Sequence, residues 1–435
     1  MKKLITIVLL LAIIFSCKEK INTTKNVVAV SLIDSAYVAS KTAYFTINNN
    51  QIQGEGLNTI KSLINESQFV TLGEIHNAKQ VSKFTTAIMP FLYDANYKYF
   101  ALEIGPNSAD KLTELSTPYQ STVKNLYDFN TKYTKSEFKS NNNSSSDPIV
   151  FFAGVEDAEF LKEARKYNME LWGLDQEFYY SIMFFTDELL KEAKNKPNYN
   201  EIKLLKTLAD KSIYKWLLAR AKGELAEEDN DALSKIRDDD NVKAFFNSFD
   251  EQDTRAQKII NDLKSSWDIY ISWRSSHVDR VSYIRNNFLN NYKDRLKKNE
   301  ELPKVFIKIG SAHASKTISN TAYDIGHLTE ELAKKNGTIS NSLNTWTPTF
   351  KTSSGKIINV FDRTYYKRLA LFTQFSKENK WAIIDLKSIR KDIENNIILL
   401  PNTGDFHRLK WLIESYDYQL ILPKAEIVTP NREQD

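Results

Sequence analysis

Cysteine is almost absent from this sequence: Cys17 is the only one, so neither a disulfide framework nor a cluster of thiolate metal ligands can form. Glycine and proline are also rare over one long stretch, since residues 224–309 contain no glycine and residues 198–302 contain no proline. An excess of one charge is lacking as well. The formal net charge of the 435-residue chain is only +4, which argues against nucleic acid as a partner.

Several common catalytic motifs are missing from the sequence. There is no Gly-x-Ser-x-Gly, the turn that presents the nucleophilic serine of α/β-hydrolases. There is no phosphate-binding loop ending in Gly-Lys-Ser/Thr, no Gly-x-Gly-x-x-Gly after a strand, and no His-Glu-x-x-His. Histidine and carboxylate side chains are therefore the main candidates for chemistry.

The first residues have the pattern of an export signal. Two lysines precede an apolar run at residues 4–15, which is too short to span a bilayer as a stable helix. The run ends in Ile-Phe-Ser-Cys, which resembles the lipobox of bacterial lipoproteins. We therefore expect residues 1–17 to be a signal peptide and Cys17 to carry the lipid, including palmitate, that anchors the protein in the cell envelope, at the outer membrane. A plain secretory signal with a chance cysteine is the alternative.

Four short apolar runs each end at an acid or a histidine. They read VTLGEIH (70–76), YFALEIG (99–105), ELWGLDQE (170–177) and VFIKIGSAH (305–313). Such runs are typical of buried parallel strands, and ligands bind outside the carboxyl ends of those strands. We therefore expect five side chains to converge on one site, namely those of Glu74, His76, Glu103, Asp175 and His313.

The order of helical and strand patterns predicts an α/β fold, in which helices flank a central, mainly parallel sheet. Helical spacing at residues 81–89 links the first two strands into a β-α-β unit, which predicts that they are neighbours in the sheet. Apolar residues recur at helical spacing through the stretch that lacks glycine and proline, which predicts a large all-helical insertion. The expected segments are a tether (18–40), a first α/β part (41–177), the insertion (178–300) and a second α/β part (301–435).

Two of the five histidines lie in the same frame, Gly-x-x-His, at the end of an apolar run. The glycine would let the chain turn off the strand, which places His76 and His313 above the edge of the sheet. One such frame alone is compatible with a hydrogen-bonded histidine of no special role. Two of them, both at strand ends, favour a functional pair.

Clustered carboxylates beside histidines suit the activation of water, either alone or on a divalent metal such as Mn, Co or Zn. The metal ligands that we expect are His76, His313 and Glu103. Helix capping is the alternative role for the acids, and it is as plausible as a site role for Glu177. Arg280 could bind a substrate carboxylate or stabilise an oxyanion, or it could form a surface salt bridge.

These motifs resemble, in order, those of a superfamily that joins erythromycin esterase-like enzymes, ChaN-type haem-binding lipoproteins and Tiki/TraB proteins. Leu72-Gly73-Glu74-Ile75-His76-Asn77 is similar to the ChaN-type opening, and Ala101-Leu102-Glu103 to the segment that follows it. Trp172-Gly173-Leu174-Asp175 is similar to the esterase-like Gly-Ile-Asp, and Gly310-Ser311-Ala312-His313 to the second histidine frame of Tiki/TraB proteins. Asp279-Arg280, followed by Asn286, resembles an esterase-like helix motif.

The resemblance implies an α/β fold with a helical insertion and a site at the carboxyl edge of the sheet. From the esterase-like branch, His76 would act as a base towards water, with Glu74 and Glu103 beside it. From the Tiki branch, His76 and His313 would bind a metal in a peptidase. From the ChaN branch, the protein would be a haem-binding lipoprotein.

Three functions remain open from the sequence. The first is a lipid-anchored hydrolase that cleaves an ester or amide bond in a small-molecule or peptide substrate. In it His76 activates water, Glu74 orients it, and Glu103, Asp175 and His313 complete the site. The second is a lipoprotein that binds haem or another iron chelate without catalysis. The third is a structural protein whose site has lapsed.

Overall fold

The computed structural model describes residues 31–138, 146–225, 231–272, 277–298, 301–402 and 404–433. Cys17 and the rest of the predicted signal peptide lie outside these residues. Within the predicted tether, residues 31–40 form β1 (Ser31–Leu32) and α2 (Ser35–Ser40), and β1 pairs with β12 (Ile398–Leu399). Among the described residues, no helix has both the length and the apolar character needed to span a bilayer.

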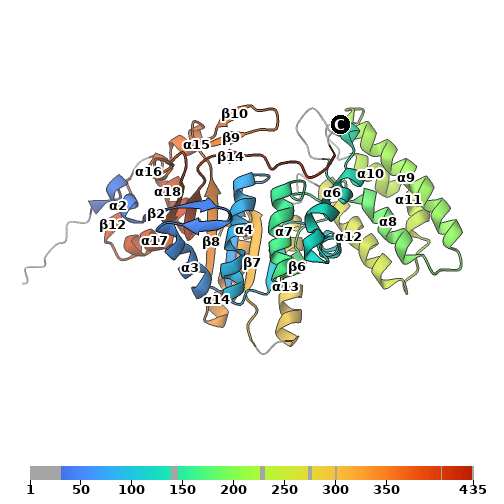
Figure 1. Cartoon of the computed structure of the whole chain (residues 1–435), viewed down its shortest axis with the longest axis horizontal. Helices are drawn as coiled ribbons and strands as arrows, with labels where there is room; N and C mark the ends of the chain where they lie inside the picture. Colours follow the sequence, from blue (N-terminus) through green and yellow to red (C-terminus); the bar gives the residue numbers. More distant parts are fainter. Residues whose placement is uncertain are drawn as a thin grey trace, which may run out of the picture.

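A nine-stranded sheet forms the centre of the molecule, in the order β3-β2-β11-β13-β8-β4-β7-β5-β6 (Figure 1). The bounds of the strands are Thr42–Asn48 (β2), Gln51–Gln53 (β3), Phe69–Glu74 (β4), Tyr99–Leu102 (β5), Glu170–Gly173 (β6), Val305–Gly310 (β7), Ser340–Trp346 (β8), Trp381–Asp385 (β11) and Tyr418–Ile421 (β13). The strands from β13 to β6 are all parallel, whereas β3, β2 and β11 form an antiparallel edge. The predicted α/β fold with a mainly parallel sheet is confirmed.

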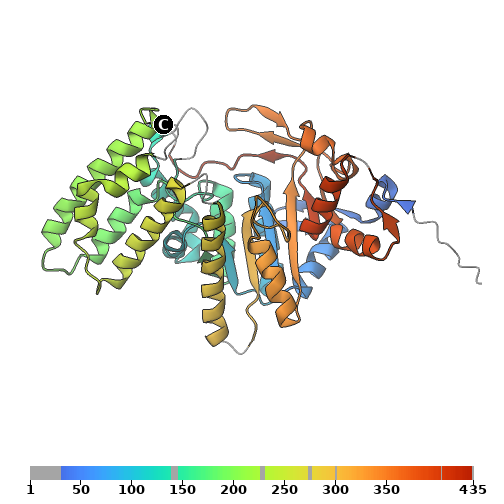
Figure 2. The ribbon, with the colours of Figure 1, turned by 180° about the vertical axis from the view of Figure 1, so that it is seen from behind.

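Helices cover both faces of this sheet, which explains why its strands read as continuous apolar runs. On one face, α3 (Gly56–Glu66), α4 (Lys79–Asp94) and α7 (Val155–Lys166) contribute to one apolar core. On the opposite face, a second core includes side chains of α13 (His277–Lys298), α14 (Ile325–Asn336), α17 (Leu386–Glu394) and α18 (Phe406–Ser415), as the reverse view shows (Figure 2).

The order of the strands differs from the expected one. β4 and β5 are not neighbours, because β7 lies between them and pairs with both. Val305, the first residue of β7, is paired with Phe69 on one side and with Tyr99 on the other. A crossover helix fixes only that two strands are parallel, and it leaves room for a strand from far along the chain to enter between them.

The central strand β8 was not predicted, because its sequence, SNSLNTW, has few apolar residues although every residue is buried. Its polar side chains form internal hydrogen bonds that make this burial possible. The Asn344 amide donates to Oε1 of Gln419 at 2.9 Å, and the hydroxyl of Thr345 donates to the backbone oxygen of Gly73 at 2.8 Å.

The predicted helical insertion is also observed. Its helices are α8 (Ile182–Glu192), α9 (Tyr199–Ala221), α10 (Asp231–Asp238), α11 (Asp240–Phe246), α12 (Thr254–Ile271) and the long α13. Most of them form a lobe beside the β6 end of the sheet, whereas α13 runs back across one face (Figures 1 and 2). The remaining helices are α5 (Pro106–Leu115), α6 (Thr122–Tyr133), α15 (Thr364–Lys367) and α16 (Ala370–Thr373), with 3-10 turns at Tyr119–Ser121 and Ser136–Phe138.

A second, small sheet lies beyond the carboxyl edge of the first. It consists of β9 (Thr349–Lys351), β10 (Ile357–Asn359) and β14 (Ala425–Glu426). From β14 the chain continues along the top of the molecule toward the helical lobe (Figure 1). On this path the backbone of Val428 bonds to Asn77, directly after His76, so the segment lies beside the loop that carries this histidine.

Candidate active site at the carboxyl edge of the sheet

The carboxyl ends of four neighbouring strands carry the charged side chains of the candidate site. Glu74 is the last residue of β4, Glu103 follows β5 directly, and Asp175 lies two residues after β6. β7, which lies between β4 and β5, ends at Gly310. Because the strands are parallel, their ends meet at one edge of the sheet, and the predicted convergence of these side chains is observed.

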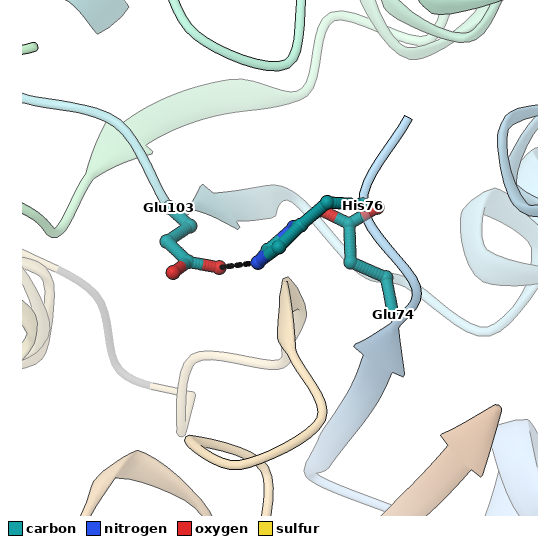
Figure 3. A group of neighbouring side chains, drawn as sticks. All are labelled: Glu74, His76 and Glu103. Atoms are coloured by element: carbon teal, nitrogen blue, oxygen red, sulfur yellow. Dashed lines mark hydrogen bonds and ion pairs between the residues drawn. The ribbon is translucent and has the colours of Figure 1, made fainter. Parts of the chain in front are cut away.

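Glu103 lies between two imidazole rings, each of which turns its Nε2 toward the carboxylate. The distance from Nε2 of His76 to Oε2 of Glu103 is 3.8 Å, and that from Nε2 of His313 to Oε1 is 3.5 Å. A second carboxylate faces Nδ1 of each ring: Oε1 of Glu74 at 3.3 Å from His76, and Oδ2 of Asp324 at 2.5 Å from His313. Figure 3 shows the His76 half of this arrangement, which we call the His-Glu-His row.

The row leaves no space for a side chain at Gly310. Its backbone N–H donates to Oε2 of Glu103 at 2.5 Å, and a Cβ atom there would lie 2.9 Å from Nε2 of His76. Neither Gly310 nor Gly73 has a positive φ. The glycines of the two Gly-x-x-His frames are therefore needed because neighbouring atoms pack closely against their backbone. They are not needed for the tight turn that the sequence suggested.

Two buried or partly buried cations pair with carboxylates of the site. Lys308, in the middle of β7 and only 3% exposed, bonds to Oε2 of Glu74. Arg280, near the start of α13, donates from Nη2 to Oε1 of Glu103 at 3.0 Å and from Nε to Oδ1 of Asp175 at 3.0 Å. One of the roles considered from the sequence was a surface salt bridge. Arg280 does form ion pairs, but they lie inside the site and not on the surface.

The charges at the site leave an excess of negative charge. The four carboxylates are those of Glu74, Glu103, Asp175 and Asp324, and within the described part of the chain they face the lysine and arginine cations of Lys308 and Arg280 alone. Protonated imidazoles or a divalent cation would neutralise the difference. The arrangement therefore favours positive charge at the two imidazoles.

The pKa values of the site residues follow from these contacts. Burial disfavours the charged form of Glu74, but the charge of Lys308 and the bond to His76 outweigh it and lower the pKa of the carboxyl to about 2. Desolvation likewise opposes charge on His76, but Glu74 and Glu103 outweigh it and raise the pKa of the ring. The pKa of His313 is raised in the same way, because Asp324 and Glu103 outweigh desolvation.

Two residues of the site were not identified from the sequence. Lys308 is a charged residue within an otherwise apolar strand. A lysine in such a strand indicates a buried partner of opposite charge, and this signal could have identified Lys308 as a residue of the site. Asp324 precedes α14, and its Oδ1 accepts the backbone N–H of Ile325 at 2.7 Å. An aspartate directly before a helix is usually an N-cap, and this role alone explains Asp324 in the sequence. Its second role, as the partner of His313, therefore has no sequence signal of its own.

Glu177 caps a helix. Of the two roles that the sequence left open, capping and a part in the site, the contacts support capping. Its Oε1 accepts the backbone N–H of Asn107 at 2.7 Å and that of Ser108 at 3.3 Å, in the first turn of α5. Burial raises the pKa of this carboxyl to about 7. Glu177 therefore stabilises the start of α5 and does not contribute to the His-Glu-His row.

Two aromatic rings beside the row were also not expected. The ring of Phe151 stacks on that of His76, with centroids 4.1 Å apart, and Phe151 has a φ of 63°, which is rare for a residue with a large side chain. His277 is partly buried, with its ring centroid 6.4 Å from that of His313. Its Nε2 has no hydrogen-bond partner among the described residues.

Comparisons with known proteins find similarity in structure only. No family model and no curated protein matches this chain. A solved structure of a Bacillus cereus protein matches with a TM-score of 0.50 and 14% identity, over 92% of this chain and 98% of the other. At this identity the match shows the fold alone.

Two further solved structures belong to branches that the sequence motifs resemble. A mutant of the erythromycin esterase EreC in its open conformation matches with a TM-score of 0.48 and 14% identity, over 88% of this chain and 98% of the other. ChaN of Campylobacter jejuni, with cofacial haem, matches with a TM-score of 0.30 and 12% identity, over 70% of this chain and 91% of the other.

The buried pair of Lys308 and Glu74 gives a first prediction. Lys308→Met should lower the free energy of unfolding by about 3–5 kcal/mol, because it leaves the carboxylate of Glu74 buried without its cation. Urea denaturation at pH 7 measures this loss. Lys124→Met is the matched control, because Lys124 is exposed and its pair with Asp128 should contribute less than about 1 kcal/mol. Equal effects of the two substitutions would contradict the prediction.

The raised pKa values give a second prediction. Because the pKa of His313 is higher in the folded protein than in the unfolded chain, its protonation stabilises the fold below about pH 6.5, the ordinary value for histidine. This contribution disappears as the pH rises through the folded pKa. Asp324→Asn should therefore lower the pKa of His313, measured by NMR titration of metal-free protein, and leave that of His76 unchanged. A shift of both rings, or of neither, would argue against the assigned contacts.

Proposed function

We propose that this protein is a hydrolase that activates water at the His-Glu-His row and cleaves an ester or amide bond. The observation that carries the proposal is the pair of imidazoles that converge on Glu103, each oriented at Nδ1 by its own carboxylate. Such a carboxylate fixes the tautomer of the ring and stabilises its protonated form, as general acid-base catalysis requires. Glu74 would orient His76 in this way, and not the water itself.

In the proposed reaction, the oxygen of a water molecule attacks the carbonyl carbon of the substrate. His76, whose side chain is 39% exposed and so within reach of solvent, takes the proton of that water at Nε2. The bond between the carbonyl carbon and the leaving oxygen or nitrogen then breaks. The leaving group takes a proton from His313, whose raised pKa favours the protonated form. Exchange with solvent restores both rings.

The donor set also fits a divalent metal. The ligands expected from the sequence, His76, His313 and Glu103, are of a type that suits Mn, Co or Zn. In the structure, the ligand atoms that lie within 4.8 Å of one another belong to Glu74, His76 and Glu103, so that Glu74 would take the place of His313. The excess negative charge favours a cation there. When bound, such a metal would polarise the substrate carbonyl. Asp175 would act indirectly, by positioning Arg280 against Glu103.

Haem binding is the alternative that the sequence left open. An exposed imidazole is a suitable axial ligand, and the stacked ring of Phe151 would support a flat ligand beside His76. The four carboxylates around the row favour a small cation over the apolar face of a porphyrin.

We also propose that a lipid on Cys17 anchors the protein to the cell envelope. The site would then act on small molecules or peptides in that compartment.

Loss of either imidazole should abolish most of the activity. On a panel of esters and peptides, His76→Ala and His313→Ala should each lower kcat/KM by about 10²–10⁴-fold, the usual contribution of a general acid or base. Tyr93→Ala, at an exposed tyrosine of α4 away from the site, should leave it unchanged. If turnover survives in both site variants, the proposal is wrong. A saturable Soret shift with haemin that disappears in His76→Ala would instead support haem binding.

Metal binding can be measured without a substrate. Calorimetric titration of chelator-treated protein with Mn²⁺, Co²⁺ or Zn²⁺ should give one site per chain. Glu103→Gln should weaken this site at least tenfold, because it removes both a ligand and a negative charge. Glu114→Gln, at an exposed glutamate of α5, is the control and should bind as the unchanged protein does. Equal affinity in Glu103→Gln would exclude Glu103 as a ligand.

A further inference from the structure

An aromatic cleft opens at the carboxyl end of β8, beside the candidate active site. Its volume is about 400 Å³, which is within the range of small-molecule sites. Five aromatic residues line it, namely Trp346, Tyr365, Tyr366, Trp411 and Tyr416. Ser319 and Asn320 also line it, so that polar groups lie beside the rings.

The cleft and the His-Glu-His row share two loops. Ile75, which lines the cleft, lies between Glu74 and His76, and Ser311 lies between Gly310 and His313. The Tyr416 hydroxyl donates to the backbone oxygen of Ser311 at 2.8 Å. Consecutive Cα atoms are about 3.8 Å apart, so the cleft begins within two residues of both imidazoles. The two loops that carry the imidazoles therefore also form part of the wall of the cleft.

A second cavity, of about 500 Å³, adjoins the first. The two share Tyr365 and Trp411, and the second is also lined by Arg368 and Arg408. Arg368 lies 3.7 Å from Asp405, whereas Arg408 has no carboxylate partner among the described residues and lies over the ring of Tyr365 at 5.5 Å. The far end of the combined cleft therefore carries unbalanced positive charge.

We propose that this cleft is a subsite for an acidic saccharide that carries the scissile ester or amide bond. The rings of the walls would pack against the C–H face of a sugar, and the side chains of Ser319 and Asn320 would bond to its hydroxyl groups. Arg408 would bind a carboxylate on the next sugar. The positive charge of Arg408 at the far end of the cleft favours an acidic sugar over a purely hydrocarbon chain as the occupant. The inference rests on the proposed function, because it names the substrate class of that site.

Binding can be tested without turnover by calorimetry on the full chain with two probes, an oligosaccharide of uronic acids and a neutral oligosaccharide of equal length. We expect the acidic probe to bind and the neutral one to bind at least tenfold more weakly. Trp411→Ala should weaken binding of the acidic probe at least tenfold. Arg408→Gln should remove most of the preference for the acidic probe, and it covers the case in which Trp411→Ala fails to fold.

Tyr93→Ala is the matched control, because Tyr93 is an exposed aromatic residue that stacks on Tyr167 outside the lining of both cavities. It should bind the acidic probe with unchanged affinity. Equal binding of both probes, or unchanged binding in Trp411→Ala, would overturn the proposed subsite. Hydrolysis of sugar-free esters with no saccharide binding would also overturn it while leaving the proposed function intact. Saccharide binding without any hydrolysis would support the subsite and contradict the proposed function alone.

Discussion

The carboxylate of Glu103, only 3% exposed, is the constraint on which the arrangement of the site depends. A buried carboxylate is costly unless it is paired and hydrogen-bonded, and four partners from different parts of the chain meet this need. Gly310 supplies a backbone N–H from β7, and Arg280 supplies a guanidinium from the helical insertion. The two imidazoles face the carboxylate from either side.

This arrangement explains why the helical insertion is tied to the α/β part. The long helix α13 packs on one face of the sheet, and its first turns place Arg280 between Glu103 and Asp175. The lobe formed by the other inserted helices lies at the β6 end, whereas the aromatic cleft lies on the β8 side of the row. The substrate specificity that we propose would therefore come from the α/β part and not from the lobe.

Much of the site could be predicted from the sequence because its residues follow apolar strands. Four strands could be predicted from the apolar runs that precede Glu74, Glu103, Asp175 and Gly310. Because parallel strands end at the same edge of a sheet, the side chains that follow them were expected to converge. The order of those strands could not be predicted, because the entry of β7 between β4 and β5 depends on contacts between segments about 200 residues apart.

The missed parts share a physical cause: their side chains contradict the local pattern of their element. β8 is polar although buried, since its side chains bond to neighbouring strands and loops. Lys308 lies in an apolar strand because Glu74 is beside it, and Asp324 caps a helix while it also holds His313. Each of these side chains depends on a partner that is distant in sequence. The pattern of a single segment carries no information about such a partner.

The measurement that tests the account most directly is the titration of both imidazoles, followed by NMR, in metal-free Glu103→Gln. If Glu103 faces both rings, loss of its charge should lower the pKa of His76 and that of His313 together. A pKa that falls for one ring only, or for neither, would show that the two histidines do not share this carboxylate and would contradict the His-Glu-His row.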